Sequence, residues 1–145
     1  MFYLFLDFDG VTHPISASGR YFRPENIKPV EQAIEGLNPR IVISSTWRLD
    51  KSLCDLKELL GDIIGSCVVG VTPEFDDPFV HHPRHLEVEM YLEQNGITNV
   101  PWLAIDDTAA FYREDASLLL TDSGTGFTKN DIEKFRNLVL IITSQ

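Results

Sequence analysis

The sequence predicts an α/β fold, in which a doubly wound parallel sheet lies between two layers of helices, in a single domain over residues 1–145. Three observations predict it. Short apolar runs without polar alternation recur along the chain, as in strands that are buried on both faces. Segments with helical spacing of apolar residues lie between these runs. Three of the runs lead directly into acidic or hydroxyl side chains, at the edge where such sheets bind ligands.

The first strand is expected in the apolar run that leads from Met1 to Asp7 and Asp9. After it, in residues 11–24, the turn signal Ser16–Gly19 separates two short apolar flanks. We therefore expect a small hairpin, or flap, over the end of the first strand. No insertion in the chain is long enough for a large cap domain, so the predicted Rossmann-like fold has only this flap in place of a cap.

The next elements alternate between helix and strand. A helix is expected from Pro29 onward, because proline suits a first helical turn. Arg40–Ser45 has the pattern of a second buried strand. Asp50 is placed to cap the second helix, and Gly61 to end it. The third strand is expected in Ser66–Thr72.

The second half of the chain continues the alternation. Arg84 opens a helix after the polar loop Pro73–Pro83, and Asn95 with the glycine after it ends that helix. Two more strands and a terminal helix follow, and the start of this helix carries a capping pattern. The strands and the capping residues are Trp102–Ile105, Ser117–Thr121, and Thr128 with Asp131.

Composition is that of an ordinary globular protein, with 43% hydrophobic and 23% charged residues. The net charge of −10 argues against a nucleic-acid partner, because such binding usually needs a basic surface. No segment has the length and apolarity of a signal peptide or a membrane span. We therefore expect a cytoplasmic protein that does not bind membranes. The sequence does not indicate its oligomeric state.

Side chains suited to metal or phosphate binding follow three of the predicted strands. Because the carboxyl ends of parallel strands meet at one edge, we expect these side chains to converge. Four carboxylates with neighbouring hydroxyls favour a hard divalent cation with oxygen ligands, and Mg²⁺ fits best. Such a cation would neutralise the acids and leave a place for phosphate. The residues are Asp7 and Asp9, Ser44, Ser45 and Thr46, and Asp106 and Asp107.

The Asp7-Phe-Asp-Gly segment allows two interpretations when it is taken alone. The two carboxylates can share one pocket, as a metal ligand or nucleophile beside a general acid. They can also belong to an Asp-Gly turn in which they only cap backbone amides.

Four motifs in order resemble those of the haloacid dehalogenase-like (HAD) hydrolase superfamily, and the resemblance covers nearly the whole chain. The stretches at residues 45–48 and 121–128 are also similar to a compact branch found among RNA-repair-associated proteins. The four motifs are Asp7-Phe-Asp-Gly-Val, Ile41-Val-Ile-Ser-Ser, Arg84, and Leu103-Ala-Ile-Asp-Asp.

This resemblance implies a magnesium-dependent phosphatase with an aspartyl-phosphate intermediate. Asp7 would be the nucleophile, and Asp9 would be the general acid and base. The substrate would be a small phosphorylated molecule or an exposed phosphorylated end. The implied Mg²⁺ ligands are Asp7, the backbone carbonyl of Asp9, Asp106, and Asp107 as a direct or indirect ligand. The implied substrate-binding residues are Gly10, Ser45, Thr46 and Arg84.

Two other function classes compete with a phosphatase. A phospho-receiver domain also gathers acids at a sheet edge, but here the third strand ends in Thr72 without an acid, and the fifth lacks the lysine that such a domain needs. A catalytically idle metal-binding or interaction domain is the second alternative. The presence of Asp9 argues against it, because an idle domain has no chemical need for a second acid.

Several residues keep two interpretations. Arg84 either binds phosphate or only begins a helix. His81 and His85, beside His82, have a spacing that could hold a transition metal, although Pro83 interrupts their helix and a surface loop is the alternative. Arg48 is either a structural residue or a substrate contact. The same two possibilities apply to the flap residues Arg20, Tyr21 and Arg23.

Overall fold

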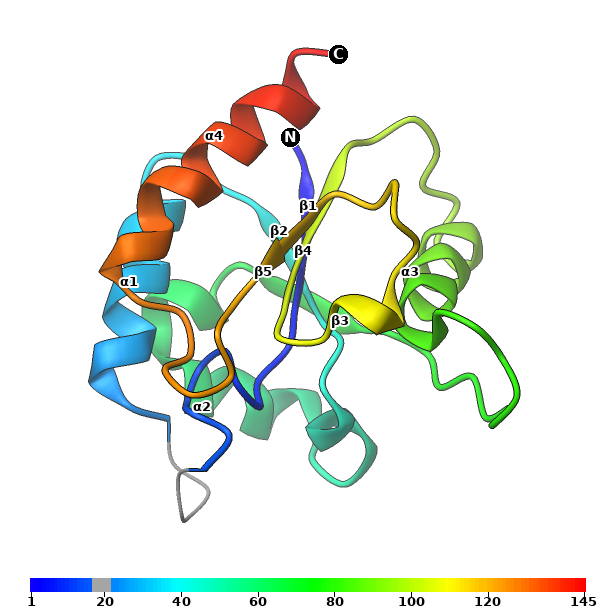
Figure 1. Cartoon of the computed structure of the whole chain (residues 1–145), viewed down its shortest axis with the longest axis horizontal. Coiled ribbons are helices and arrows are strands. Elements are labelled where there is room, and N and C mark those ends of the chain that lie inside the picture. Colours follow the sequence, from blue (N-terminus) through cyan, green and yellow to red (C-terminus); the bar gives the residue numbers. More distant parts are fainter. Residues whose placement is uncertain (17–21) are drawn as a thin grey trace.

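The structure is a computed structural model that describes residues 1–16 and 22–145. In these ranges five strands form one parallel sheet with the order β3-β2-β1-β4-β5 (Figure 1). The predicted α/β fold is thereby confirmed. The strands are β1 (Tyr3–Leu6), β2 (Arg40–Ile43), β3 (Val68–Val71), β4 (Trp102–Asp106) and β5 (Leu118–Leu120).

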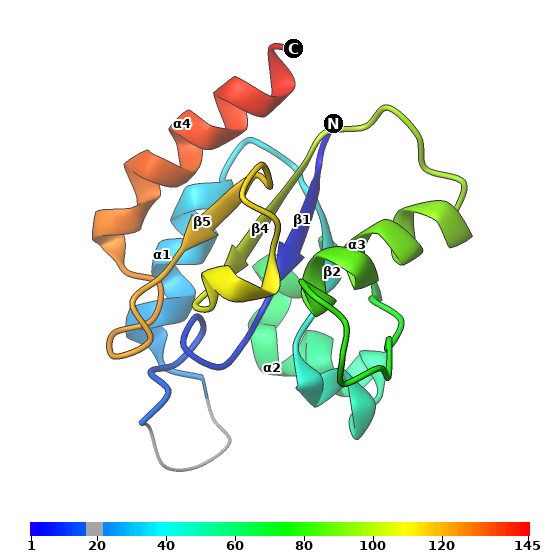
Figure 2. The ribbon, with the colours of Figure 1, turned by 45° about the vertical axis from the view of Figure 1, so that its right-hand side comes forward.

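The helices cover the two faces of the sheet unequally (Figure 2). Three of them, α1 (Pro24–Ile34), α2 (Leu53–Gly65) and α4 (Ile132–Thr143), pack on one face and enclose the larger core. The other face carries α3 (Pro83–Gln94) and a smaller core. Three short 3₁₀ helices complete the described structure: η1 (Thr46–Leu49), η2 (Ala109–Phe111) and η3 (Lys129–Asp131).

Side chains along the central strands alternate between these two cores, as the pleat of a strand requires. Leu6 and Ile43 are in register and point into the larger core, together with Ile105 of β4. Phe5 and Val42 point to the α3 face. The residue after each strand therefore continues this alternation, and its position decides which face its side chain reaches.

The start of α1 differs from the prediction. The helix begins at Pro24 rather than at Pro29, because Pro24 itself occupies the first helical turn and Arg23 O accepts hydrogen bonds from two N–H groups of that turn. Pro29 lies inside the helix with its ring buried in the core. The cost of its missing N–H is therefore offset by apolar burial.

The boundaries of α2 also differ. Ser52, not Asp50, caps the helix, since its Oγ accepts the Asp55 N–H at 3.1 Å. Gly61 has φ 85° and ψ 174°, which interrupts the helix where a stop was predicted. Helical turns nevertheless resume and continue to Gly65, because glycine admits this conformation without a steric penalty.

The first turn of α3 and the cap before α4 are close to their predictions. Helix α3 begins at Pro83, one residue before Arg84, and its buried side chains include His85, Glu87 and Val88. A buried glutamate was not expected on this helix. The capping box of Thr128 and Asp131 is present as predicted, and leads through η3 into α4.

The segment between β1 and α1 forms the flap region. Val11 and Thr12 each donate a backbone N–H to Phe8 O at 2.9 Å, which makes one helical turn after Asp7. The Arg23 N–H bonds Thr12 O at 3.4 Å and so joins the two sides of the segment. Residues 17–21, with most of the predicted turn and with Arg20 and Tyr21, lie outside the described residues.

None of the helices in the described ranges is long and apolar enough to cross a bilayer.

Candidate active site

Three polar residues lie at the carboxyl ends of the central strands, on the face that α3 covers. The Asp7 N–H donates to Ile105 O at 3.1 Å, and the Ser44 N–H donates to Leu6 O at 3.0 Å, so both residues prolong the ladder of the sheet. Because Leu6, Ile43 and Ile105 point into the larger core, the next residues, Asp7, Ser44 and Asp106, point to the α3 face. All three are buried.

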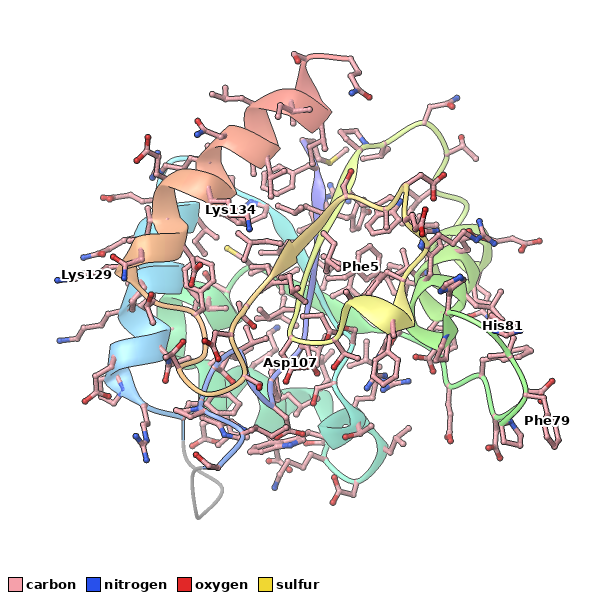
Figure 3. The ribbon with its side chains drawn as sticks, in the orientation of Figure 1. Phe5, Phe79, His81, Asp107, Lys129 and Lys134 are labelled. Atoms are coloured by element: carbon pink, nitrogen blue, oxygen red, sulfur yellow. The ribbon has the colours of Figure 1, made fainter. Side chains whose placement is uncertain are left out.

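The carboxylates of Asp7, Asp106 and Asp107 meet at this edge. Each offers an oxygen, and these oxygens lie within 4.8 Å of one another. Among the described residues no other group of three such side chains comes this close. We call these three residues the acidic cluster. Asp107 is labelled in Figure 3, near the end of the sheet away from the two chain termini. An oxygen-only set of this kind suits Mg²⁺.

Burial and mutual repulsion raise the pKa values in the acidic cluster. The pKa of Asp7 lies well above 3.8, first because the carboxyl is desolvated and then because Asp106 is negative; the positive charge of Arg84 acts in the opposite direction. Desolvation likewise raises the pKa of Asp106 to about 6, although a backbone N–H bond from Thr108 opposes it. The cluster therefore favours either a bound proton or a cation between the carboxylates.

Fixed donors orient the two acids of β4. Asp106 accepts the Thr108 N–H at 3.1 Å and the Tyr112 hydroxyl at 3.2 Å. Asp107 accepts the Thr108 hydroxyl at 3.0 Å. Burial, and then the negative charge of Asp106, raise the pKa of Tyr112 well above 10, so this phenol stays protonated and donates. A metal bound here would meet carboxylates that are already held in place.

Gly10 makes room for Asp107. The backbone at Gly10 has φ 77°, and its carbonyl accepts the Thr121 hydroxyl at 2.7 Å. A Cβ at this position would overlap the carboxylate of Asp107. Both the left-handed backbone and the close approach of the acid therefore require glycine. This geometry gives Gly10 a clear role in the shape of the site.

Asp9 lies outside the acidic cluster and has different neighbours. Its Oδ1 is bonded by His13 Nε2 at 2.9 Å and by the Trp47 indole N–H at 3.1 Å. Its side chain is 43% exposed. From the sequence, neither Trp47 nor His13 was assigned a catalytic role. Only the fold reveals these contacts, because His13 and Trp47 lie on different segments.

The hydroxyls after β2 divide between two tasks. Ser45, the predicted substrate ligand, accepts the Trp47 N–H at 3.2 Å and caps η1. The Ser44 hydroxyl is buried in the row of Asp7 and has no hydrogen-bond partner among the described residues. The structure thus brings Ser44, rather than Ser45, to the face that carries Asp7. Thr46 is exposed at the start of η1.

Arg84 and Arg48 are joined by the buried carboxylate of Glu87. Arg84 Nη1 donates to Glu87 Oε1 at 3.1 Å, and Arg48 Nη2 donates to Glu87 Oε2 at 2.8 Å. Arg84 also borders a hollow of about 190 Å³ that Thr46 and Phe111 line. The side chain of Arg84 is therefore held beside an opening, where it can reach a ligand.

Arg48 is a structural residue. Its five N–H groups all have acceptors, four of them backbone carbonyls at the ends of β2 and β3 and the fifth Glu87. The carbonyls belong to Ser44, Ser45, Thr72 and Pro73. This decides between the two interpretations that the sequence left open.

In the part of the chain that the structure describes, His81, His82 and His85 do not come together as a group of metal ligands. His82 Nδ1 contacts Ala110 O at 3.3 Å, whereas His85 Nε2 contacts Glu89 at 3.1 Å and its Nδ1 accepts the Arg113 N–H at 3.3 Å. Both ring nitrogens of His85 are thus used inside the fold. His81 lies on the loop that Figure 3 shows at the side of the molecule, where Phe79 is also labelled.

A parallel sheet with acids at the carboxyl ends of β1 and β4, and only a flap where a cap could be inserted, defines the class of compact HAD-like domains. The family described as "HAD domain in Swiss Army Knife RNA repair proteins" matches residues 3–132, and the chain belongs to this family. No curated protein and no solved structure matches the chain. Membership in the family supports a HAD-type phosphatase or hydrolase.

Proposed function

We propose that this chain is a magnesium-dependent phosphatase that hydrolyses phosphomonoesters through an aspartyl-phosphate on Asp7. The observation that carries the proposal is the division between two acids near the end of β1. Asp7 is buried among other carboxylates, and Asp9 is half exposed and held by two side chains. A nucleophile and a proton carrier need such different surroundings.

The acidic cluster would hold the cation. The carboxylates of Asp7 and Asp106 are buried and repel each other, and desolvation raises both pKa values although the positive charge of Arg84 opposes it. Asp107 and the backbone carbonyl of Asp9 complete the proposed ligand set, since Asp107 shares the oxygen cluster. When bound, Mg²⁺ would screen the repulsion between the nucleophile and the phosphate dianion.

The protein residues carry out two displacements. An Asp7 carboxylate oxygen attacks phosphorus, the bond from phosphorus to the alcohol oxygen breaks, and Asp9 gives its proton to that oxygen. Water then attacks the phosphorus of the aspartyl-phosphate and loses a proton to Asp9, and the bond from Asp7 to phosphorus breaks. The products are an alcohol and inorganic phosphate, and both acids return to their initial states.

We assign the phosphate-binding hydroxyl to Ser44 instead of Ser45. Ser44 faces the side of Asp7 with an unused hydroxyl, whereas Ser45 Oγ accepts the Trp47 N–H and caps η1. Arg84 supplies positive charge for the phosphoryl oxygens. Gly10 gives the acidic cluster its shape, and Thr46 lies at the mouth of the hollow beside Arg84.

The substrate would be a small phosphomonoester or an exposed phosphorylated end. The family description names RNA repair proteins, which makes a phosphorylated RNA end one substrate to test. The net charge of −10 opposes binding along a nucleic-acid backbone, so a terminal phosphate fits better than an internal segment. Comparison of an oligoribonucleotide with a terminal phosphate and a mononucleotide, at two salt concentrations, would distinguish these substrates.

A cytoplasmic location stays a prediction.

Phosphate release from an aryl phosphate, with Mg²⁺ and with a chelator, tests the proposal. We expect turnover only when Mg²⁺ is present. We also expect a phosphorylated form of the wild-type protein that is absent from Asp7→Asn. The matched control is Asp62→Asn, which removes an exposed carboxylate on α2. Turnover that persists in Asp7→Asn, or that is equal with the chelator, would contradict the proposal. Inactivity of the wild-type protein toward every phosphomonoester would favour the idle metal-binding domain.

A further inference from the structure

The carboxylate of Asp9 is held at one of its two oxygens. His13 Nε2 and Trp47 Nε1 both contact Oδ1, at 2.9 Å and 3.1 Å. Oδ2 has no hydrogen-bond partner among residues 1–16 and 22–145. A carboxylate that is bonded on one side only has a defined orientation, and its other oxygen remains available to a ligand.

The imidazole of His13 is itself fixed from the opposite side. Its Nδ1 lies 2.8 Å from Pro14 O. The backbone of His13 is tied in as well, because Gly10 donates its N–H to His13 O at 2.9 Å. The ring therefore stands in one orientation, with Nε2 directed at Asp9.

Aromatic packing holds the rings of His13 and Trp47 together. The His13 ring is nearly parallel to Phe22, with centroids 6.1 Å apart, and the Trp47 ring packs on Phe22 at 5.2 Å. Phe8 contacts the indole edge to face at 5.5 Å. We call Asp9, His13, Phe22 and Trp47 the Asp9 pocket. Its members come from three segments, namely the turn after β1, the residues before α1, and η1.

We propose that His13 and Trp47 are positioning residues, which orient Asp9 so that Oδ2 faces the oxygen of the leaving alcohol. The inference rests on the proposed function, and adds two residues that lie outside the four HAD motifs. The imidazole and the indole act through Asp9 and do not touch the substrate phosphate. Without them the carboxylate rotates freely, and proton transfer loses its geometry.

Leaving groups of different acidity separate this role from a structural one. Phenolate is a poor leaving group and needs a proton as the ester bond breaks, whereas dinitrophenolate departs without one. Loss of Asp9 orientation should therefore slow phosphoryl transfer from phenyl phosphate much more than from dinitrophenyl phosphate. The parameter to compare is kcat/KM, because it reports the step in which the alcohol leaves.

The test measures kcat/KM for both esters with saturating Mg²⁺. For Trp47→Phe, which keeps a ring and removes the donor, we expect a loss of about tenfold or more with phenyl phosphate and less than about threefold with dinitrophenyl phosphate. His13→Ala should give the same selective loss, and His13→Gln, which keeps a donor, should restore part of it. Trp102→Phe is the matched control, since this indole packs on Phe5 in the smaller core.

Equal losses with the two esters would overturn the inference and make His13 and Trp47 packing residues. The inference would also be overturned if all variants kept wild-type activity with both esters. Failure of the proposed function has a different signature, namely a wild-type protein that hydrolyses neither ester. If circular dichroism shows that one variant is unfolded, the result for the other variant tests the inference, because His13 and Trp47 lie on different segments.

Discussion

Asp7 and Asp9 are two residues apart but lie in opposite surroundings. Asp7 is 6% exposed, and its desolvation and the negative charge of Asp106 disfavour the charged form, against the positive charge of Arg84. The side chain of Asp9 is 43% exposed, and its Oδ1 contacts His13 Nε2 and accepts the indole N–H of Trp47. The carboxylates of the acidic cluster thus repel one another, whereas the Asp9 carboxylate has two side chains that bond one of its oxygens. In the mechanism that we propose, this difference lets one short motif supply both a nucleophile and a proton carrier.

Asp7→Asn should have the largest effect of any single change. It removes the attacking oxygen, so turnover should fall to background while the protein stays folded. Phosphate release and far-ultraviolet circular dichroism check this. A variant with near wild-type activity would end the assignment of Asp7 as nucleophile.

Asp9→Asn should cost less, because the backbone carbonyl that we propose as a metal ligand is unchanged. General acid and base catalysis is typically worth about a hundred- to ten-thousand-fold, so we expect a loss of that size in kcat. Calorimetric titration with Mg²⁺ should give nearly the wild-type affinity. Loss of Mg²⁺ binding would mean that Asp9 belongs with the acidic cluster instead.

Ser44→Ala and Ser45→Ala form a matched pair that tests which face of the sheet binds phosphate. Removal of a hydroxyl bonded to a charged ligand should lower kcat/KM about tenfold in Ser44→Ala, with little change in the melting temperature. Ser45→Ala should lose the cap of η1, about 1 kcal/mol of stability, and keep most of its activity. The reverse result would restore Ser45 as the ligand of phosphate.

The smallest effect concerns the stability of the metal-free protein. The folded pKa of Asp106 is about 6, against 3.8 for a free carboxyl, so the folded state binds this proton more tightly. Stability should therefore fall as the pH rises from about 4 through 6, by on the order of 3 kcal/mol for this group alone. Without metal, Asp106→Asn should melt at a higher temperature than the wild type at neutral pH.

Thermal melts at two pH values, with and without Mg²⁺, check this prediction. Added Mg²⁺ should stabilise the wild type more than Asp106→Asn, because the variant binds the ion less tightly. Destabilisation of the variant by the same amount with and without Mg²⁺ would instead identify Asp106 as a structural residue.

The acidic cluster could be predicted from the sequence, whereas much of its surroundings could not. Asp7, Asp106 and Asp107 follow buried strands, and the parallel topology alone brings such residues to one edge. The choice between Ser44 and Ser45 depends on the register at which β2 ends, which a single residue reverses. Arg84 lies three residues before Glu87 on α3, a spacing visible in the sequence, but the burial of Glu87 and its second partner, Arg48, come only from the fold.

The Asp9 pocket illustrates the other limit. Trp47 and His13 have ordinary packing roles by residue type, and their contacts with Asp9 arise from the path of two loops. Loop geometry is not encoded by periodicity, so no pattern in the sequence could locate these donors. The early start of α1 has a similar origin, since two prolines suited to a first turn compete and only packing chooses Pro24.

The guanidinium of Arg48 has a consequence for the order of folding. It joins carbonyls at the ends of β2 and β3 to Glu87, which is 39 residues away in the sequence. This contact forms only after β2, β3 and α3 have come together, because its loop-closure entropy must first be offset. The wall of the site that holds Ser44 and Arg84 is therefore expected to assemble late. Because a region that assembles late opens early, its amides should exchange with solvent through partial opening, faster than the amides of the central strands.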